Sequence, residues 1–162
     1  MEGWLALADP ESGLIPRSPK KLHWNAEDAA ADNYSFMVLT SSLTNRERFN
    51  GRMREMLATE IKVTSRIDSL PDTFDFKSQA FRSPKPNLNR ILINSSEYIK
   101  DGLLPITEWL GKSPWSDRMI SILDDMWKHA SIDTPYGKII STDIEANGEM
   151  LQVLSRIYWM TG

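Results

Sequence analysis

The chain has 162 residues, of which 41% are hydrophobic and 25% are charged. This composition is ordinary for a soluble globular domain and argues against a disordered or fibrous chain. The formal charge of −3 offers no broad basic surface to a nucleic-acid backbone, so we expect no nucleic-acid partner. The chain has no cysteine, which excludes disulfides, thiolate metal ligands and cysteine nucleophiles and is typical of a reducing compartment.

The first ten residues, MEGWLALADP, lack the basic start and long apolar stretch of a secretion signal, and no run approaches a membrane span. We therefore expect a cytoplasmic location and no membrane partner. No phosphate-binding loop, dinucleotide-binding glycine motif or nucleophile elbow occurs. His23 and His129 lie far apart and have no carboxylate or thiolate at metal-ligand spacing, so we expect neither a cofactor nor a metal site.

A buried helix followed by an amphipathic helix is predicted for the first half of the chain. Residues 26–43 are apolar on nearly every side in their later turns, which requires burial on most sides. Residues 45–67 carry one apolar stripe among basic residues, as a helix at the protein surface does. Thr44 and Glu47 have the spacing of a capping box, so we expect them to begin this second helix.

The same order of helices returns in the second half. Residues 90–110 predict another mostly buried helix, bent at Pro105 and ended by Gly111. Ser113, followed by a proline, is predicted to cap an amphipathic helix. The apolar stripe of that helix consists of Trp115, Met119, Ile122, Leu123, Met126 and Trp127. Residues 147–160 are again apolar almost all round and predict a third buried helix.

Short turns and long loops alternate regularly along the chain. A buried helix passes to an amphipathic one within a few residues, whereas three long loops, residues 9–25, 68–89 and 131–142, make the return. Tight turns join antiparallel helices, so all the short turns should lie at one end and all the long loops at the other. Similar phrases, GLIP, SLPD and GKII, recur in the three loops and indicate a repeated helical hairpin.

Helices buried on every side that alternate with helices buried on one side are what two concentric rings require. The predicted fold class is therefore all-α, an incomplete (α/α) toroid of about three helical hairpins with buried inner and amphipathic outer helices. Residues 1–162 would form a single partial toroid domain, truncated at both ends. Its unclosed edges would expose apolar surface, which favours oligomerisation through those edges.

Four stretches resemble consecutive parts of six-hairpin glycosidase-like (α/α)6-toroid proteins, related to bacterial glycoside hydrolases and uronyl hydrolases. These are WLALADPESGLIPR, WNAEDAAADNYSFMVLTSSLT, LPDTFDF and STDIEANGEMLQVLSRIYWMTG. The resemblance runs from Trp4 to Gly162 and implies a carbohydrate substrate. It places the substrate where the long loops meet the N-terminal ends of the inner helices. It does not single out one chemistry, because glycosidases, lyases, epimerases and non-catalytic proteins share this scaffold.

The first turns of the three buried helices are polar, unlike their later turns. These residues are Asp28, Asp32 and Asn33 on the first helix, Glu97, Lys100 and Asp101 on the second, and Asp143, Glu145, Asn147 and Glu149 on the third. Paired carboxylates at this end suit acid/base hydrolysis of glycosidic bonds. Capping and the helix dipole also favour acids at helix N-termini, so each residue has a structural interpretation as well.

Asp28 and Asp32 are the more pointed pair, because like charges one turn apart on a helix repel each other. Such a pair raises the pKa of one carboxyl group, as a general acid needs, unless Arg17, Lys20 or Lys21 neutralises it.

Two further features of the loop end each allow a functional and a structural interpretation. Asp72 and Asp75 either reach over the substrate from the second long loop or form a turn. Trp24 offers either a ring for sugar stacking or a hydrophobic staple at the start of the first buried helix. The predicted catalytic residues are Asp28, Asp32, Asp72 and Asp143, and the predicted substrate-binding residues are Trp24, Asn33, Asp75, Glu145 and Asn147.

Glycosidic-bond hydrolysis by an enzyme is the function that we predict. One alternative is a non-catalytic helical-repeat scaffold that binds a polysaccharide or a protein partner. A further alternative is a sugar epimerase or polysaccharide lyase on the same toroid. Such chemistry often uses a His or Tyr base, and His23 and Tyr34 are the residues of these types near the loop end.

Overall fold

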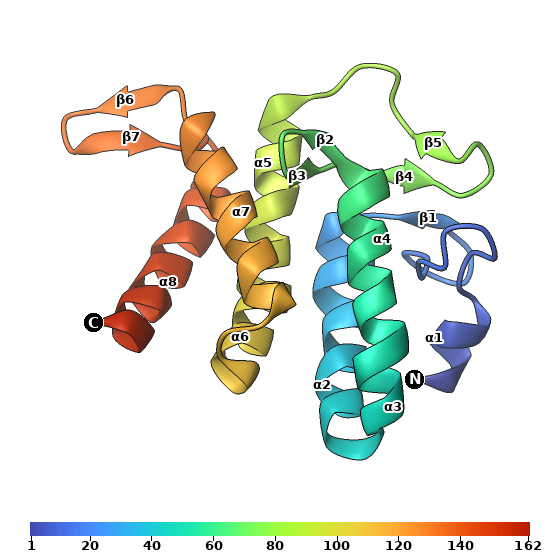
Figure 1. Ribbon diagram of the computed structural model, residues 1–162. Coiled ribbons are helices and arrows are strands. Elements are labelled where there is room, and N and C mark those ends of the chain that lie inside the picture. The colour runs from blue at the N-terminus through green and yellow to red at the C-terminus, as the bar shows by residue number, and fades with distance from the viewer.

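The computed structural model describes residues 1–162, which are mostly helical and form an open array of two layers (Figure 1). The inner layer has three segments. The first is π-helix η1 (Ala26–Tyr34) continued by α2 (Ser35–Thr44), and the third is α8 (Ile144–Thr161). The second is one continuous run of α5 (Leu88–Glu97), π-helix η3 (Tyr98–Leu103) and α6 (Leu104–Leu110). The run α5–η3–α6 lies between the other two and packs on both. Met37, Leu104 and Val153, one from each inner segment, are at most 3% exposed.

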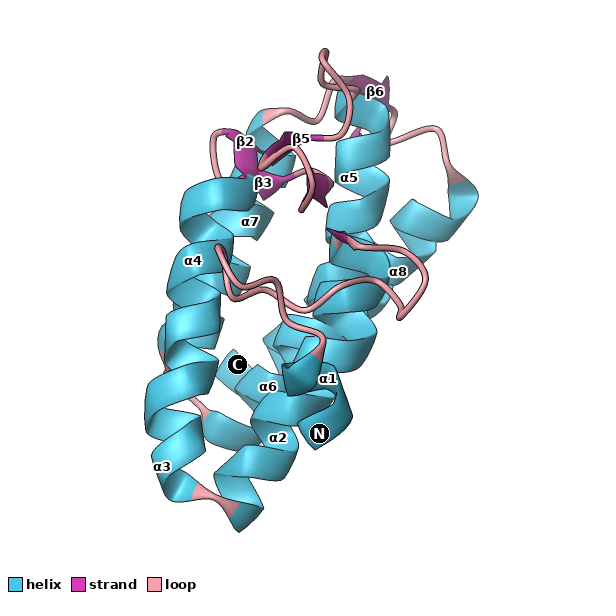
Figure 2. Cartoon of the chain, turned by 90° about the vertical axis from the view of Figure 1, so that its right-hand side faces the viewer, coloured by secondary structure: helices cyan, strands magenta, loops and turns pink.

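The outer layer covers one side of the inner helices. It consists of α3 (Arg46–Arg48), π-helix η2 (Phe49–Met53) and α4 (Arg54–Thr64) in one run, and of α7 (Pro114–Lys128). Figure 1 shows α4 and α7 in front of the inner helices, and Figure 2 shows α3 and α4 from the side. The short helix α1 (Glu2–Ala6) precedes both layers. The chain therefore alternates between inner and outer helices, but the prediction that the inner helices are buried on most sides was only partly right, since Phe36 and Leu43 of α2 and Trp109 of α6 are 67%, 69% and 60% exposed.

The long loops lie at one end of the array and the short helix–helix turns at the other, as predicted (Figure 1). The loops contain β1 (His23–Trp24), β2 (Ser65–Ile67), β3 (Leu70–Pro71), β4 (Phe74–Asp75), β5 (Ala80–Phe81), β6 (Ile132–Thr134) and β7 (Gly137–Ile139). These strands form three small antiparallel sheets, ordered β1-β4-β5, β2-β3 and β6-β7. The prediction of a purely all-α fold was wrong in this respect, because strands of two or three residues are too short to show an alternating pattern.

Local hydrogen bonds explain where the helices begin. Ser113 and Ser116 form the capping box of α7, so the predicted start of that helix is confirmed. Asn45, rather than Thr44, caps the first outer helix, because the Asn45 side chain accepts a hydrogen bond of 2.9 Å from the backbone N–H of Arg48. The predicted Thr44–Glu47 capping box was therefore wrong by one residue.

The second inner segment is continuous through Pro105. This proline lies in the first turn of α6, directly after the π-helical turns of η3. Proline has no N–H to donate and crowds the preceding turn, and the wider π-helical turns accommodate it without a break.

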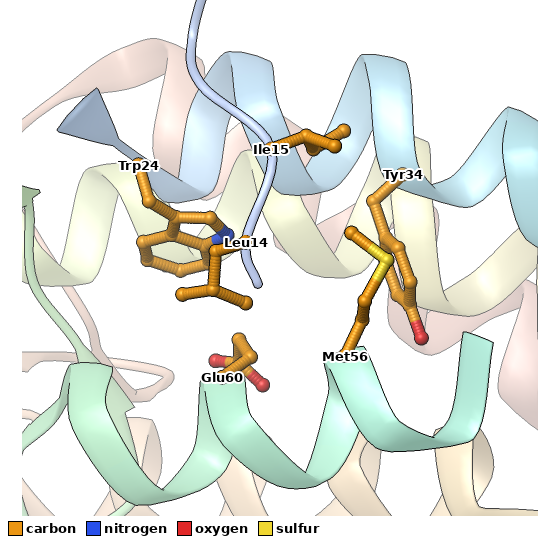
Figure 3. Close-up of a pocket in the computed structure, with 6 residues that line it drawn as sticks. All are labelled: Leu14, Ile15, Trp24, Tyr34, Met56 and Glu60. Atoms are coloured by element: carbon orange, nitrogen blue, oxygen red, sulfur yellow. The ribbon is translucent and has the colours of Figure 1, made fainter. Parts of the chain in front are cut away.

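The repeated loop phrases insert apolar side chains between the layers. Leu14, Ile15, Leu70 and Ile140 are each at most 2% exposed. Figure 3 shows Leu14 and Ile15 beside a cavity between η1 and α4 that Trp24, Tyr34, Met56 and Glu60 also line. This cavity has a volume of about 10 Å³, which is room for a single water molecule.

A buried ion pair joins the two outer helices at the loop end. The guanidinium of Arg118 on α7 donates to both carboxylate oxygens of Glu60 on α4, at 2.6 and 3.1 Å. Both side chains are at most 3% exposed, and Arg118 also donates to the carbonyl oxygen of Ser69 in the loop between β2 and β3. Because two buried charges are costly unless their hydrogen bonds are satisfied, this geometry fixes how α4 and α7 meet.

Helix α8 has an inner neighbour on one side only. Leu151, Tyr158 and Trp159 are 71%, 75% and 88% exposed, whereas Met150 and Val153 are buried against the neighbouring helices. The prediction that this helix is buried all round was therefore wrong for its outer edge. Residues 1–162 form an open array and no closed ring.

Small residues let η1 and η3 approach closely, and we call this contact the alanine–glycine seam. Ala29, Ala30 and Ala31 of η1 are at most 1% exposed. A Cβ atom added to Gly102 of η3 would lie 2.7 Å from the Ser35 Oγ and 3.1 Å from the Ala31 Cα. Only glycine, whose side chain is a hydrogen atom, therefore fits at position 102 without a shift of its neighbours.

We expect Gly102→Ala to lower the free energy of unfolding by about 1–3 kcal/mol, because the new methyl group would force the two helices apart. Gly148→Ala is the matched control, since nothing lies within 4 Å of that Cβ position in α8. The control should be neutral or should stabilise the protein by up to about 1 kcal/mol. Urea denaturation measures both, and equal stabilities of the two variants would contradict the seam.

Candidate functional site

The inner helices bring together a group of acidic side chains, which we call the inner carboxylate cluster. It consists of Glu27, Asp28, Asp32, Glu97, Asp101, Glu145 and Glu149. Lys100 lies within it, with its Nζ 2.9 Å from Glu149 Oε1 and 3.1 Å from Asp101 Oδ2. Glu149 is 6% exposed and accepts a further hydrogen bond of 2.6 Å from the Ser96 hydroxyl. A buried carboxylate is thus tied to a lysine on the neighbouring helix.

Glu97, in the last turn of α5, is the most strongly perturbed carboxyl group of this cluster. Burial raises its pKa to about 7, and the negative charges of Glu149, Glu27 and Glu145 add to this effect. The charge of Lys100 acts in the opposite direction and offsets only part of it. A carboxyl group with a pKa of about 7 is partly protonated at neutral pH, as a general acid needs to be.

Asp28 and Asp32, one turn apart on η1, have different surroundings. Burial raises the pKa of Asp32, and the charges of Asp28 and Asp101 raise it further. Asp28 is paired with Arg17, whose Nε lies 2.8 Å from Asp28 Oδ2, and it accepts a hydrogen bond from the Asn25 side chain. Both outcomes predicted for this pair therefore occur. Neighbouring acids raise the pKa of Asp32, whereas the charge of Asp28 is matched by Arg17.

A second feature, which we call the arginine-lined pocket, lies among the long loops beside the start of α5. Its volume is about 350 Å³ and no apolar residue lines it. The charged and ionisable residues around it are Arg17, His23, Glu27, Asp72, Arg82 and Arg90. Glu27 belongs both to this pocket and to the inner carboxylate cluster, so the two features adjoin.

The small sheet β1-β4-β5 builds the pocket by tying the first long loop to the second. His23 of β1 pairs with Asp75 of β4, and the backbone N–H of Arg82, just after β5, donates to the Thr73 carbonyl. Arg82 Nη1 thereby lies 3.3 Å from His23 Nε2. Burial of the imidazole and the nearby charges of Arg82 and Arg17 lower the pKa of His23, which keeps the ring neutral.

Several of the predicted site residues make structural contacts. Asp143 caps α8 by accepting from the Ala146 N–H, and Asn147 donates to the carbonyl oxygens of Ser141 and Asp143. Asp75 accepts from the backbone and hydroxyl of Ser78 in an exposed turn. The contacts of these residues are therefore those of helix capping and turn formation, the structural interpretations given for them above.

The remaining predicted residues are divided between the core and the surface. Trp24 is 2% exposed and packs edge-on against Tyr98 of η3, so its ring is part of the core between the inner helices. Asn33 lies with Asp32 and Trp4 in a shallow groove beside α1. Asp72 lines the arginine-lined pocket and is paired with Arg66 at 2.9 Å. Glu145 is one of the charges that raise the pKa of Glu97.

Glu97, Lys100 and Glu149 belong to the polar helix positions identified in the sequence but are not among the predicted site residues. A signal for Glu149 was present, because Glu145 and Glu149 repeat the one-turn spacing of acids that drew attention to Asp28 and Asp32. No comparable signal marked Arg82, which the pairing of two-residue strands brings to the pocket, or Arg90, which lines it from the first turn of α5.

No protein-family model, curated protein or solved structure matches this chain. No helix combines the length and the apolar character that a membrane crossing requires. The acidic and histidine side chains of residues 1–162 form no group of three or more arranged to hold a metal ion. The identity of the site therefore depends on its own geometry.

The raised pKa of Glu97 predicts a pH-dependent stability. Between its ordinary value of 4.5 and about 7, the folded state binds a proton that the unfolded state has released, so the free energy of unfolding falls as pH rises. We expect Glu97→Gln to flatten this fall in urea denaturation at several pH values between 4.5 and 7. Glu47→Gln, on exposed α3, is the control and should follow the wild type. A Glu97→Gln curve parallel to the wild-type curve would contradict the assignment.

Proposed function

We propose that this protein acts on carbohydrate and hydrolyses glycosidic bonds through paired carboxylates on its inner helices. The observation that supports the proposal is the position of Glu97 beside Glu149, Glu27 and Glu145, where burial and these charges raise its pKa to about 7. Hydrolysis of this kind needs one carboxyl group that donates a proton and another that stays charged. Within the cluster, burial raises the pKa of Glu97, whereas Asp28 is paired with the guanidinium of Arg17.

Glu97 is the proton donor in this proposal. Its proton passes to the glycosidic oxygen as the bond to the leaving sugar breaks, and the carboxylate left behind is stabilised by the Lys100 ammonium nearby. Asp28, held by Arg17 and Asn25, is the carboxylate that acts on the opposite side, either on a water molecule or on the sugar itself. Asp32 is a second acid of the same helix.

Two further observations support a site at this place. Four of its acids, Glu27, Asp28, Asp32 and Asp101, lie on η1 and η3, and π-helical turns occur frequently at functional sites. The long loops also gather at the same end as the arginine-lined pocket, which is the arrangement that the resemblance to six-hairpin toroid proteins implies (Figure 1). A partial toroid of that kind is the architecture that we propose for the open array.

The alternative of a non-catalytic scaffold is favoured by one observation, the exposed apolar edge of α8 formed by Leu151, Tyr158 and Trp159. That edge offers area for a protein partner or a further copy of the chain. The alternative of an epimerase or lyase receives less support. The Tyr34 hydroxyl donates to the Met53 carbonyl and accepts from the Trp115 indole in the core, and burial raises its pKa.

We expect Glu97→Gln and Asp32→Asn to reduce turnover of aryl glycosides or uronides, the former by about 100-fold or more, because removing a general acid costs about that much. Asp75→Asn, in an exposed turn, is the matched control and should keep full turnover. Far-UV circular dichroism and urea denaturation verify folding. Full turnover by folded Glu97→Gln would contradict the proposed role, and a wild-type chain with no turnover on either substrate class would favour the scaffold.

A further inference from the structure

The free side of α8 carries apolar residues at a regular spacing, which we call the heptad stripe. Helix α8 packs on α5 and η3, and the stripe consists of Ile144, Leu151 and Tyr158 on the side away from them, which are 89%, 71% and 75% exposed. These residues follow one another at intervals of seven, so they lie along one face of the helix. Apolar side chains at this interval are the pattern by which one helix packs along another.

Two opposite charges lie along one border of the heptad stripe. Glu145 is exposed in the first turn of α8, and Arg156 lies about three turns further on, so both side chains project from the same side of the helix. An ion pair with Glu108 of α6 holds the Arg156 guanidinium in place, and one third of the Arg156 side chain remains exposed. The free face of α8 therefore has an apolar centre and a border that is acidic at one end and basic at the other.

A second α8 helix laid antiparallel on the first matches this face. If a two-fold axis passes through Leu151, Ile144 of each copy faces Tyr158 of the other, because the two residues are equally far from the axis. Glu145 of each copy then lies beside Arg156 of the other, since both are on the border that the two helices share. A parallel pairing would bring Glu145 to Glu145 and Arg156 to Arg156, and like charges repel. The face is therefore complementary to itself in the antiparallel orientation.

We propose that the free face of α8 binds a second copy of this chain, through an antiparallel pairing of the two α8 helices about a two-fold axis at Leu151. The β6-β7 hairpin projects past the start of α8 on the same free side, with a fully exposed Tyr136 at its tip (Figure 1). In the antiparallel pair this tip lies near the end of the other α8 helix, where Trp159 is 88% exposed. The pairing thus covers apolar side chains of the hairpin and of the helix together.

One pair of helices buries a small interface, so we expect a reversible dimer with a dissociation constant of about 1–100 μM. This inference does not depend on the hydrolysis proposed above, because the free face of α8 includes neither of the proposed catalytic acids, Glu97 and Asp28.

The first test is sedimentation equilibrium of the full chain at concentrations below and above this range. Leu151→Asp should weaken the dimer by about 100-fold or more, because it replaces an apolar contact at the axis by two facing carboxylates. Leu43→Asp, the same change at a leucine of α2 that is 69% exposed, is the matched control and should leave the dimer unchanged. A wild-type chain that stays monomeric throughout, or a dimer that Leu151→Asp does not weaken, would overturn the proposal.

The charge contact has a test of its own. Glu145→Arg should weaken the dimer by about tenfold, because two-fold symmetry repeats the lost ion pair at both ends. Glu47→Arg, the same charge change on exposed α3, is the control and should have no effect on the dimer. Equal dimerisation of the Glu145→Arg variant and the wild type would overturn the Glu145–Arg156 contact.

Cysteine cross-linking tests the orientation, since the chain has no cysteine of its own. Under mild oxidation, a mixture of the Ile144→Cys and Tyr158→Cys variants should form a cross-linked heterodimer, whereas Ile144→Cys alone should not cross-link. A disulfide requires Cα atoms within about 7 Å, which the antiparallel pairing provides only between positions 144 and 158. Phe36→Cys, at an exposed position of α2, is the control and should remain monomeric. Cross-linking of Ile144→Cys to itself, with none in the mixture, would overturn the antiparallel arrangement.

Discussion

The close contact of η1 with η3 at Gly102 is the constraint on which the rest of this structure depends. The backbones of Ala31 on one helix and Gly102 on the other approach until an added methyl group would lie 3.1 Å from the Ala31 Cα atom and 2.7 Å from the Ser35 Oγ atom. Packing of this kind leaves little freedom in the relative position of the helices, because the contacts are between backbone and small side chains. The side chains on the adjoining faces of η1 and η3 are therefore held at a fixed spacing.

Those faces carry charge. The packing that buries the alanines also places the acids of η1 beside Glu97 and Asp101, while α8 adds Glu145 and Glu149 from the other side. Repulsion within such a group is tolerated because Lys100 pairs with two of its members and because Glu97 retains a proton. The arginine-lined pocket adjoins the cluster through Glu27, which belongs to both.

Much of this arrangement was predictable from the sequence, and the missing parts have physical reasons. The apolar patterns around Met37 and Leu104 predicted helices with a buried face, and both residues are buried, but Phe36 and Trp109 of the same helices are 67% and 60% exposed. The apolar pattern also predicted that Trp159 is buried, but this residue is 88% exposed, because a sequence pattern does not show whether another helix packs on that side. Arg82 was not predicted, because strands of only two residues bring it to the pocket. Asp143 was predicted as a catalytic residue and Glu97 was not, because the pKa of Glu97 depends on burial and on charges from other helices, which a local sequence pattern does not contain.

Titration of the Glu97 side-chain carboxyl carbon by NMR tests the central claim most directly, with Glu97→Gln used to assign the signal. We expect a midpoint near pH 7 in the wild type, and a lower midpoint in Gly102→Ala, where the opened seam would separate and hydrate the acids. A wild-type midpoint near the ordinary glutamate value would contradict the coupling of the inner helices and, with it, the proposed proton donor.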